Sequence, residues 1–291
     1  MLVSVDVGFS TTKICTDGDD GIVCNSIPTA VAFPSNSGVV GVGTEQFVIK
    51  FRDGNQLVAG EDAFDSEQQL ENTSIDWLIR VMSTLVLTAV NKTSISMEQV
   101  SRLAVGLPIQ FWQHEANKLK SLLSNIELET KTYKPEVFVY AQGAGAFHYY
   151  RSIMNPPVSE NGLLIDLGGN TLQVLKYDGL KLKAALSKQY NHLGMLEPAK
   201  KLANKVATDH AISISTAKSM TILLSGTFST PGDYQLQSQQ LISDHMRLLM
   251  DRLDADFGER IKQAHRLVLA GGGAYHLIHQ LPEAWKRKAI L

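Results

Sequence analysis

The chain has 291 residues, 44% of them hydrophobic and 19% charged, which excludes a disordered or low-complexity protein and is enough for two folded domains. Its 27 Lys and Arg against 29 Asp and Glu give a formal net charge of −2, which argues against a basic coat for nucleic acid. Two cysteines, Cys15 and Cys24, are too few for a disulfide framework or a cysteine-based zinc site, so we expect small apolar residues in a reducing compartment. With no bilayer-length apolar run and no basic signal-peptide start, the sequence predicts a soluble cytoplasmic protein without membrane contact.

The first part of the chain predicts a β-meander followed by a small insertion. Leu2–Val7 alternates apolar residues and stops at Gly8, Lys13–Thr16 follows as a second strand, and a third begins at Ile22. Residues 28–70 are rich in Gly, Pro and β-branched residues, which is typical of a small β-rich insertion, and short strands are expected around Phe47–Phe51 and Gln56–Ala59. The elements expected next are a helix over Asn72–Asn91 capped by Thr73 or Ser74, a strand over Leu103–Leu107, a surface helix over Glu115–Leu123, a strand over Val137–Tyr140 and a small-residue helix over Gln142–Tyr150.

After the linker-like Asn155-Pro156-Pro157, the opening pattern recurs. Val3–Thr11 matches Leu163–Thr171 position by position, with a strand, an Asp, a glycine turn and a second strand, so we expect two halves of similar design. The remaining predicted elements are helices near Met195–Thr208 and Ser215–Leu224, a long helix over Gln235–Gln263, a strand over Leu267–Ala270 and a helix from Tyr275.

Each of the two repeated turns combines an Asp at the end of a strand with glycine and hydroxyl residues. Such turns let backbone N–H groups face an anion, and an Asp at the rim can hold a hydrated Mg²⁺. Lys13, on the strand after the first turn, can add a positive charge near phosphates. One Asp-x-Gly turn alone is better explained as an ordinary hairpin, but two in register favour a clamp for a polyphosphate.

Two further features fit a nucleotide site. Ala270-Gly271-Gly272-Gly273-Ala274 follows a buried strand, and its glycines would let a base or sugar approach the backbone, although a flexible turn before a helix explains it equally well. Gln142 follows the strand Val137–Tyr140 and can orient a water for attack on a γ-phosphate; the alternative is a helix-capping amide. The chain has no P-loop, and the fingerprint starting at Gly143 lacks its third glycine.

These motifs stand in the chain order of the actin/Hsp70/sugar-kinase superfamily and resemble most closely the bacterial actin-like ATPases of the ParM/StbA plasmid-segregation type. The resemblance includes the spacing from Asp6 to Lys13, Gly106-Leu107-Pro108 at a strand end, and Leu164–Leu172 as a second phosphate loop. Phe33-Pro34-Ser35 and Val58–Ala63 are similar to the insertion of that group. The resemblance implies an α/β actin-like two-domain fold, each half a ribonuclease-H-like mixed sheet flanked by helices, with the nucleotide in the cleft between the halves.

The resemblance also implies roles for individual residues. Asp6 and Asp166 would organise Mg²⁺ through water, and Gln142 would position the attacking water, so these three form the expected catalytic set. The residues expected to bind the cofactor, ATP with GTP as the alternative, are Gly8, Phe9, Ser10, Thr11, Lys13, Gly168, Gly169, Asn170, Thr171, Glu197, Lys218, Gly271, Gly272, Gly273 and Ala274.

The expected domains are 1–154, carrying the insertion, and 155–274. Members of the resembled family usually continue past the glycine-rich turn with a helix, a strand and a final helix that returns to the first domain. Only about one helix and the start of a strand remain here, so we expect residues 275–291 to be a shortened helix returning to domain one.

The function implied is an ATPase that forms nucleotide-dependent filaments and segregates plasmid DNA through a small DNA-binding adaptor at a centromere-like site, without binding DNA directly. One alternative is a small-molecule kinase of the same superfamily, which would need a catalytic base for a substrate hydroxyl; no Asp stands in an obvious position for it. Another alternative is a non-filamentous ATP-binding scaffold of the pilus-assembly or cell-division type. A chaperone is disfavoured, since no substrate-binding domain follows.

Overall fold

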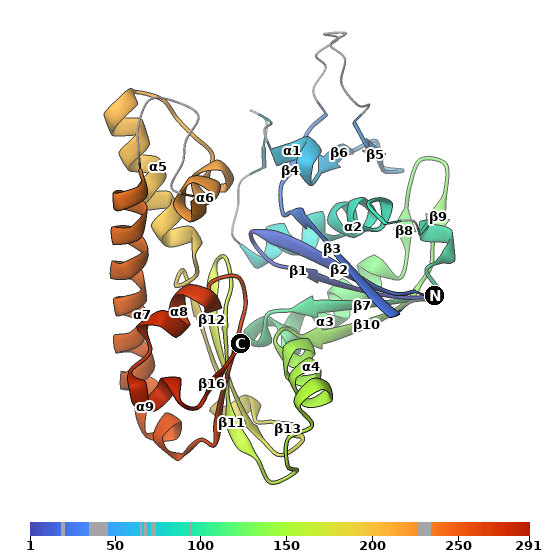
Figure 1. The fold of residues 1–291 in the computed structure, drawn as a ribbon. Helices are drawn as coiled ribbons and strands as arrows, with labels where there is room; N and C mark the ends of the chain where they lie inside the picture. Colours follow the sequence, from blue (N-terminus) through green and yellow to red (C-terminus); the bar gives the residue numbers. More distant parts are fainter. Residues whose placement is uncertain are drawn as a thin grey trace. The chain divides into compact units, whose positions relative to one another are not determined.

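The computed structural model describes residues 1–291 except 19–20, 35–45, 65, 67–68, 71–73, 94 and 226–233. The chain divides into two compact units, Met1–Gln142 and Gly143–Leu291, each built on its own sheet (Figure 1). The division falls after Gln142 and not after Met154, because helix α4 (Ala144–Met154) packs in the second unit. Its Phe147 ring lies 5.2 Å from Tyr177, and its Tyr150 hydroxyl donates to Glu160.

The first unit contains a five-stranded sheet in the order β10–β7–β1–β2–β3. Its strands are β1 (Leu2–Val7), β2 (Thr11–Gly18), β3 (Gly21–Pro28), β7 (Arg102–Leu107) and β10 (Glu136–Ala141). The three strands β1, β7 and β10 run parallel, while β2 and β3 form the predicted antiparallel meander with β1. The other elements are β4 (Val31–Ala32), β5 (Ile49–Lys50), β6 (Gln56–Ala59), α1 (Glu61–Phe64), α2 (Ile75–Asn91), a 3₁₀ turn (Met97–Gln99), α3 (Ile109–Leu123), β8 (Ile126–Glu127) and β9 (Thr132–Tyr133).

The period-two pattern of β1 decides which face of this sheet is buried. Val3, Val5 and Val7 enter the core together with apolar residues of α2 such as Leu78 and Met82. The alternate residues, Asp6 among them, lie on the exposed side. Helix α2 begins after Ser74, whose hydroxyl accepts from the Trp77 N–H at 3.2 Å, so the predicted cap is confirmed at Ser74. The other candidate start, residues 72–73, lies outside the described residues.

Part of the predicted insertion is a small sheet. Strands β4, β6 and β5 pair in that order, and β6 covers the predicted strand at Gln56–Ala59. The strand expected over Phe47–Phe51 is reduced to β5, and Ser35 of the Phe33-Pro34-Ser35 motif lies outside the described residues. Helix α3 begins at Ile109 rather than Glu115, because Pro108 directly precedes its first turn and the helix continues through Phe111 and Trp112.

The second unit repeats the design of the first. Its sheet has the order β13–β12–β11–β15–β16, with β14 also pairing with β12. As in the first unit, antiparallel strands flank the first strand on one side and two parallel strands continue on the other, which confirms two halves of similar design. Its elements are β11 (Asn161–Leu167), β12 (Thr171–Asp178), β13 (Lys181–Leu182), a 3₁₀ turn (Ala184–Leu186), β14 (Lys188–Asn191), α5 (Leu196–His210), α6 (Thr216–Ser225), α7 (Gln235–Gln263), β15 (Arg266–Ala270), α8 (Ala274–Gln280), α9 (Glu283–Lys286) and β16 (Ala289–Ile290).

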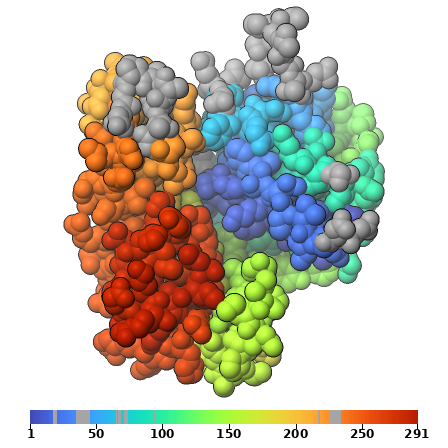
Figure 2. Space-filling model, viewed as in Figure 1, coloured from blue at the N-terminus to red at the C-terminus, as the bar shows by residue number. Residues whose placement is uncertain are grey.

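Residues 275–291 do not form the expected helix that returns to the first domain. This C-terminal segment instead completes the second sheet. Strand β16 pairs in parallel with β15, and Leu277, Leu281 and Trp285 are buried in the second core. Lys288 Nζ donates to the carbonyl groups at the end of α7. Figure 2 shows the red C-terminal segment packed directly against the orange atoms of α7.

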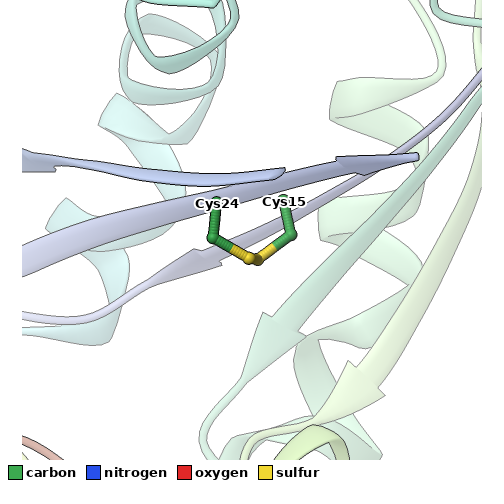
Figure 3. The surroundings of a disulfide bond; sticks show 2 residues. All are labelled: Cys15 and Cys24. Carbon is green, nitrogen blue, oxygen red and sulfur yellow. A yellow bond between two sulfur atoms is a disulfide. The ribbon is translucent and has the colours of Figure 1, made fainter. Parts of the chain in front are cut away.

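The two cysteines form a disulfide, which corrects the expectation of two unlinked apolar residues. The antiparallel register places Cys15 on β2 directly opposite Cys24 on β3, with a Cα–Cα distance of 4.1 Å (Figure 3). This pairing could not be seen until the hairpin register was known. In the described part of the chain, no helix combines the length and apolar character needed to cross a membrane.

Candidate functional site

The first predicted phosphate turn joins β1 to β2 in the first unit. The Gly8 N–H donates to the Thr11 carbonyl at 3.1 Å, which closes the turn over Phe9 and Ser10. A Cβ at Gly8 would lie 3.0 Å from that carbonyl oxygen, so glycine permits the tight closure. Phe9 packs partly against the first core, and this anchors the turn instead of leaving the ring free for a ligand.

Asp6 and Lys13 lie directly opposite each other on the two strands that enter and leave this turn, and both are exposed. Desolvation by neighbouring protein atoms raises the pKa of the Asp6 carboxyl, even though the side chain reaches solvent. The Lys13 charge and a hydrogen bond from Gln142 lower the same pKa by less. A carboxylate and an ammonium group therefore lie on neighbouring strands at the mouth of the turn.

Gln142 is brought to this pair from the end of β10. Its backbone N–H donates to Leu107 O at 2.8 Å, and its side-chain Nε2 donates to Asp6 Oδ1 at 3.1 Å and to Val7 O at 3.2 Å. Both partners of the side chain are acceptors, so only the NH₂ end of the amide can face them, and Oε1 is turned the other way. The helix-capping alternative does not apply, because α4 begins after Gly143 and has no side-chain cap.

The second predicted turn, between β11 and β12, has the same geometry. The Gly168 N–H donates to Thr171 O at 2.9 Å, and Asp166 lies opposite Gln173, as Asp6 lies opposite Lys13. The second turn therefore carries a neutral amide where the first carries a cation. Asn170 and Thr171 are only 3% and 7% exposed, so their side chains are less available to a ligand than predicted.

Backbone N–H groups at the start of α5 hold the second turn by donating to the carbonyl groups of that turn. Gly194, Met195 and Leu196 donate their N–H groups to Asn170, Gly168 and Gly169 at 3.2, 3.0 and 2.7 Å. A Cβ at Gly194 would lie 2.1 Å from Gly169 O, so only glycine fits there. Gly194 was not among the predicted site residues, although a glycine directly before a predicted helix start was a usable signal.

The glycine-rich loop after β15 packs on the end of β11. Gly271 has φ +85°, and a Cβ there would lie 2.4 Å from both Asp166 Oδ1 and Leu167 O. The Gly273 N–H donates to Leu167 O at 2.9 Å, and its Cβ would collide with the Leu167 side chain. These two glycines are explained by packing, whereas Gly272 has open space around it and Ala274 is buried.

The two residues predicted more loosely lie on α5 and α6. Glu197 follows Leu196, which contacts the second turn, and its carboxylate pairs with Lys200 at 3.0 Å. Lys218 is exposed on α6, whose Ser219 hydroxyl donates to Ala199 O on α5. The structure thus brings Glu197 next to the turn and places Lys218 on the neighbouring helix.

The donor set is compatible with Mg²⁺ held mainly by water and phosphate. The described residues contain no group of three or more His, Cys, Asp or Glu that could hold a metal ion unaided. Mg²⁺ usually keeps several waters and takes one or two carboxylates together with substrate phosphates. The exposed Asp6 in the first unit and the partly exposed Asp166 in the second each match that requirement.

Comparison with known proteins agrees with this description. Residues 4–145 match the family model for the actin-like proteins N-terminal domain, and a search of curated proteins finds no match. A non-polymerisable quadruple mutant of pCBH ParM has a TM-score of 0.80 at 16% identity, covering 100% of this chain and 94% of that chain.

Two further solved structures cover 100% of this chain and 93% of their own, each with a TM-score of 0.76: an archaeal actin homologue in complex with ADP, at 18% identity, and the ParM of a 15-stranded filament from Clostridium botulinum, at 15% identity. At these identities the likeness establishes the fold. Residues 4–145 thus match the actin-like N-terminal domain family, and the chain as a whole has the actin-like two-domain fold.

Proposed function

We propose that this protein is an ATPase, with the first phosphate turn at the reacting phosphates of its nucleotide. The observation that carries the proposal is the Asp6, Lys13 and Gln142 cluster at the first turn, together with the matching hairpin in the second unit. The ADP complex of the archaeal actin homologue, which has the same fold, supports nucleotide binding. ATP is the proposed substrate, with GTP as the alternative.

In the proposed reaction, water attacks the γ-phosphorus, the bond to the bridging oxygen breaks, and ADP and phosphate leave. The turn around Gly8, Ser10 and Thr11 would bind the polyphosphate, with Lys13 neutralising part of its charge. Gln142 Oε1, turned away from Asp6 and Val7, would accept a hydrogen bond from the attacking water and orient it. Mg²⁺, for which Asp6 and Asp166 are the candidate carboxylates of their respective units, would supply further charge neutralisation.

We further propose that nucleotide binding controls assembly into filaments. The ParM from Clostridium botulinum is a filament protein of the same fold, which supports self-association. A head-to-tail contact that does not close on itself generates an open filament. The proposed role is plasmid segregation in the cytoplasm through a small DNA-binding adaptor, and the net charge of −2 is consistent with indirect DNA contact.

The test is sedimentation at high speed with Mg-ATP, with Mg-ADP and without nucleotide, with phosphate release measured on the same samples. We expect a pellet with ATP alone, followed by phosphate release and loss of the pellet. Binding and slow hydrolysis without a pellet over a wide protein range would contradict the filament and favour a scaffold. Hydrolysis that requires an added metabolite would favour a small-molecule kinase.

A further inference from the structure

Gly106 lies between Asp6 and Gln142, two residues of the proposed catalytic cluster. Strand β7 separates β1 from β10 in the first sheet, and the register places Val105 beside Val5 and Gly106 beside Tyr140. Asp6 follows Val5 on one side, and Gln142 comes just after β10 on the other. Position 106 therefore lies between the Asp6 and Gln142 side chains.

The backbone does not explain a glycine at this position. Gly106 does not have a positive φ, so any L-residue could adopt its backbone conformation. Glycine in a strand interior lowers stability because it adds conformational freedom to the unfolded chain and contributes no side chain to packing. A different requirement must therefore favour glycine, which has no side chain, at this position.

The side chains of Asp6 and Gln142 need the space that a Cβ at position 106 would occupy. A Cβ at position 106 would lie 2.6 Å from Asp6 Oδ1 and 3.1 Å from Gln142 Cγ. The 3.1 Å hydrogen bond from Gln142 Nε2 to Asp6 Oδ1 could not keep its geometry with a methyl group inserted there. Since both contacted groups belong to side chains, a methyl group would displace them and leave the strands intact.

We propose that Gly106 is a positioning residue for hydrolysis: by leaving this space empty, it allows Asp6 to accept the hydrogen bond from Gln142 Nε2 and so to fix the orientation of the Gln142 amide. The inference rests on the proposed ATPase function. It assigns Gly106 no contact with nucleotide, so its substitution should act through Gln142 on turnover and leave nucleotide binding in place when Mg²⁺, which Asp6 is proposed to help hold, is absent.

The test compares Gly106→Ala with wild type in nucleotide affinity, kcat and thermal unfolding. We expect the affinity for Mg²⁺-free nucleotide to be close to wild type and kcat to be lower by about tenfold or more, because displacing a catalytic group by a fraction of an ångström slows the reaction. The matched control is Gly145→Ala, an exposed position where an added Cβ meets no atom within 4 Å, and it should leave kcat unchanged.

A double-mutant cycle separates positioning from general damage to the fold. If Gly106 acts through Gln142, then Gly106→Ala should lower kcat no further in a Gln142→Ala background. A full additional loss there, or a kcat of Gly106→Ala equal to wild type, would overturn the inference while wild-type hydrolysis would still support the ATPase. Absence of ATP hydrolysis in the wild type would instead reject the proposed function itself.

Discussion

Lys288 is expected to contribute substantially to the stability of the second unit. Its Nζ donates to Ile261 O at 3.1 Å, Lys262 O at 2.7 Å and Ala264 O at 2.8 Å, which are carbonyl groups at the C-terminal end of α7. Ile261 O also accepts from the Ala264 N–H at 3.3 Å, and a cation near these terminal carbonyls interacts favourably with the helix dipole. Replacing Lys288 with Met keeps the aliphatic stem and removes the charge and all three hydrogen bonds.

The expected cost is smaller than the sum of three charged hydrogen bonds. Lys288 is half-buried, so water can reach part of the exposed carbonyls after the substitution. Taking net values of about 0.5–1.5 kcal/mol per hydrogen bond and partial rehydration, we expect a loss of about 2 kcal/mol. For a unit the size of Gly143–Leu291, this corresponds to a decrease of about 6 °C in its unfolding temperature.

Thermal unfolding of Lys288→Met is best compared with that of Lys286→Met, a neighbouring exposed lysine on α9. The Lys286 variant should unfold close to the wild-type temperature, because a single exposed charge contributes little. Equal unfolding temperatures for the two variants would refute the reasoning that the C-terminal segment is anchored to α7 through Lys288.

Two other predictions concern groups outside the proposed site. The Cys15–Cys24 disulfide has a sequence separation of 9, so the Cys15→Ser/Cys24→Ser variant should lower the stability of the first unit by about 2.5 kcal/mol in denaturant unfolding. A dithiol reductant should have no further effect on this variant. Equal stabilities of the variant and the wild type would contradict the prediction. Burial lowers the pKa of His245 from 6.5, so the unfolded chain binds more protons below that pH and stability should fall as pH drops from 7.5 to 5.5. His245→Gln should lose less stability over this range, and an equal loss would show that other groups are responsible.

The sequence was sufficient for the features that rest on local pattern. The alternation in Leu2–Val7, and the recurrence at Leu163–Thr171 of a strand, an Asp and a glycine turn, predicted two strands with glycine turns, and both turns close through the same hydrogen bond. The long helix Gln235–Gln263 was predicted with its observed bounds. Such features depend on residues close in sequence, whose periodicity and turn chemistry can be read directly.

Features that depend on strand order and register were out of reach. The role of Gly106 requires β7 to lie between β1 and β10, and the cysteine pair requires the register of β2 against β3. The C-terminal segment was expected to return to the first domain because the resembled family usually ends in such a helix. The pairing of β16 with β15 could not be foreseen, because a two-residue strand has too short a pattern to recognise. Its place became evident only from the sheet that it extends.

The most direct test of the proposed function is a time course of Gln142→Ala beside wild type in Mg-ATP, with pelleted protein and released phosphate measured together. If Gln142 orients the attacking water, the variant should pellet with ATP as wild type does, release phosphate more slowly by about tenfold or more, and stay in the pellet. Phosphate release at the wild-type rate, with disassembly on the same schedule, would contradict the assignment of hydrolysis to the Asp6, Lys13 and Gln142 cluster.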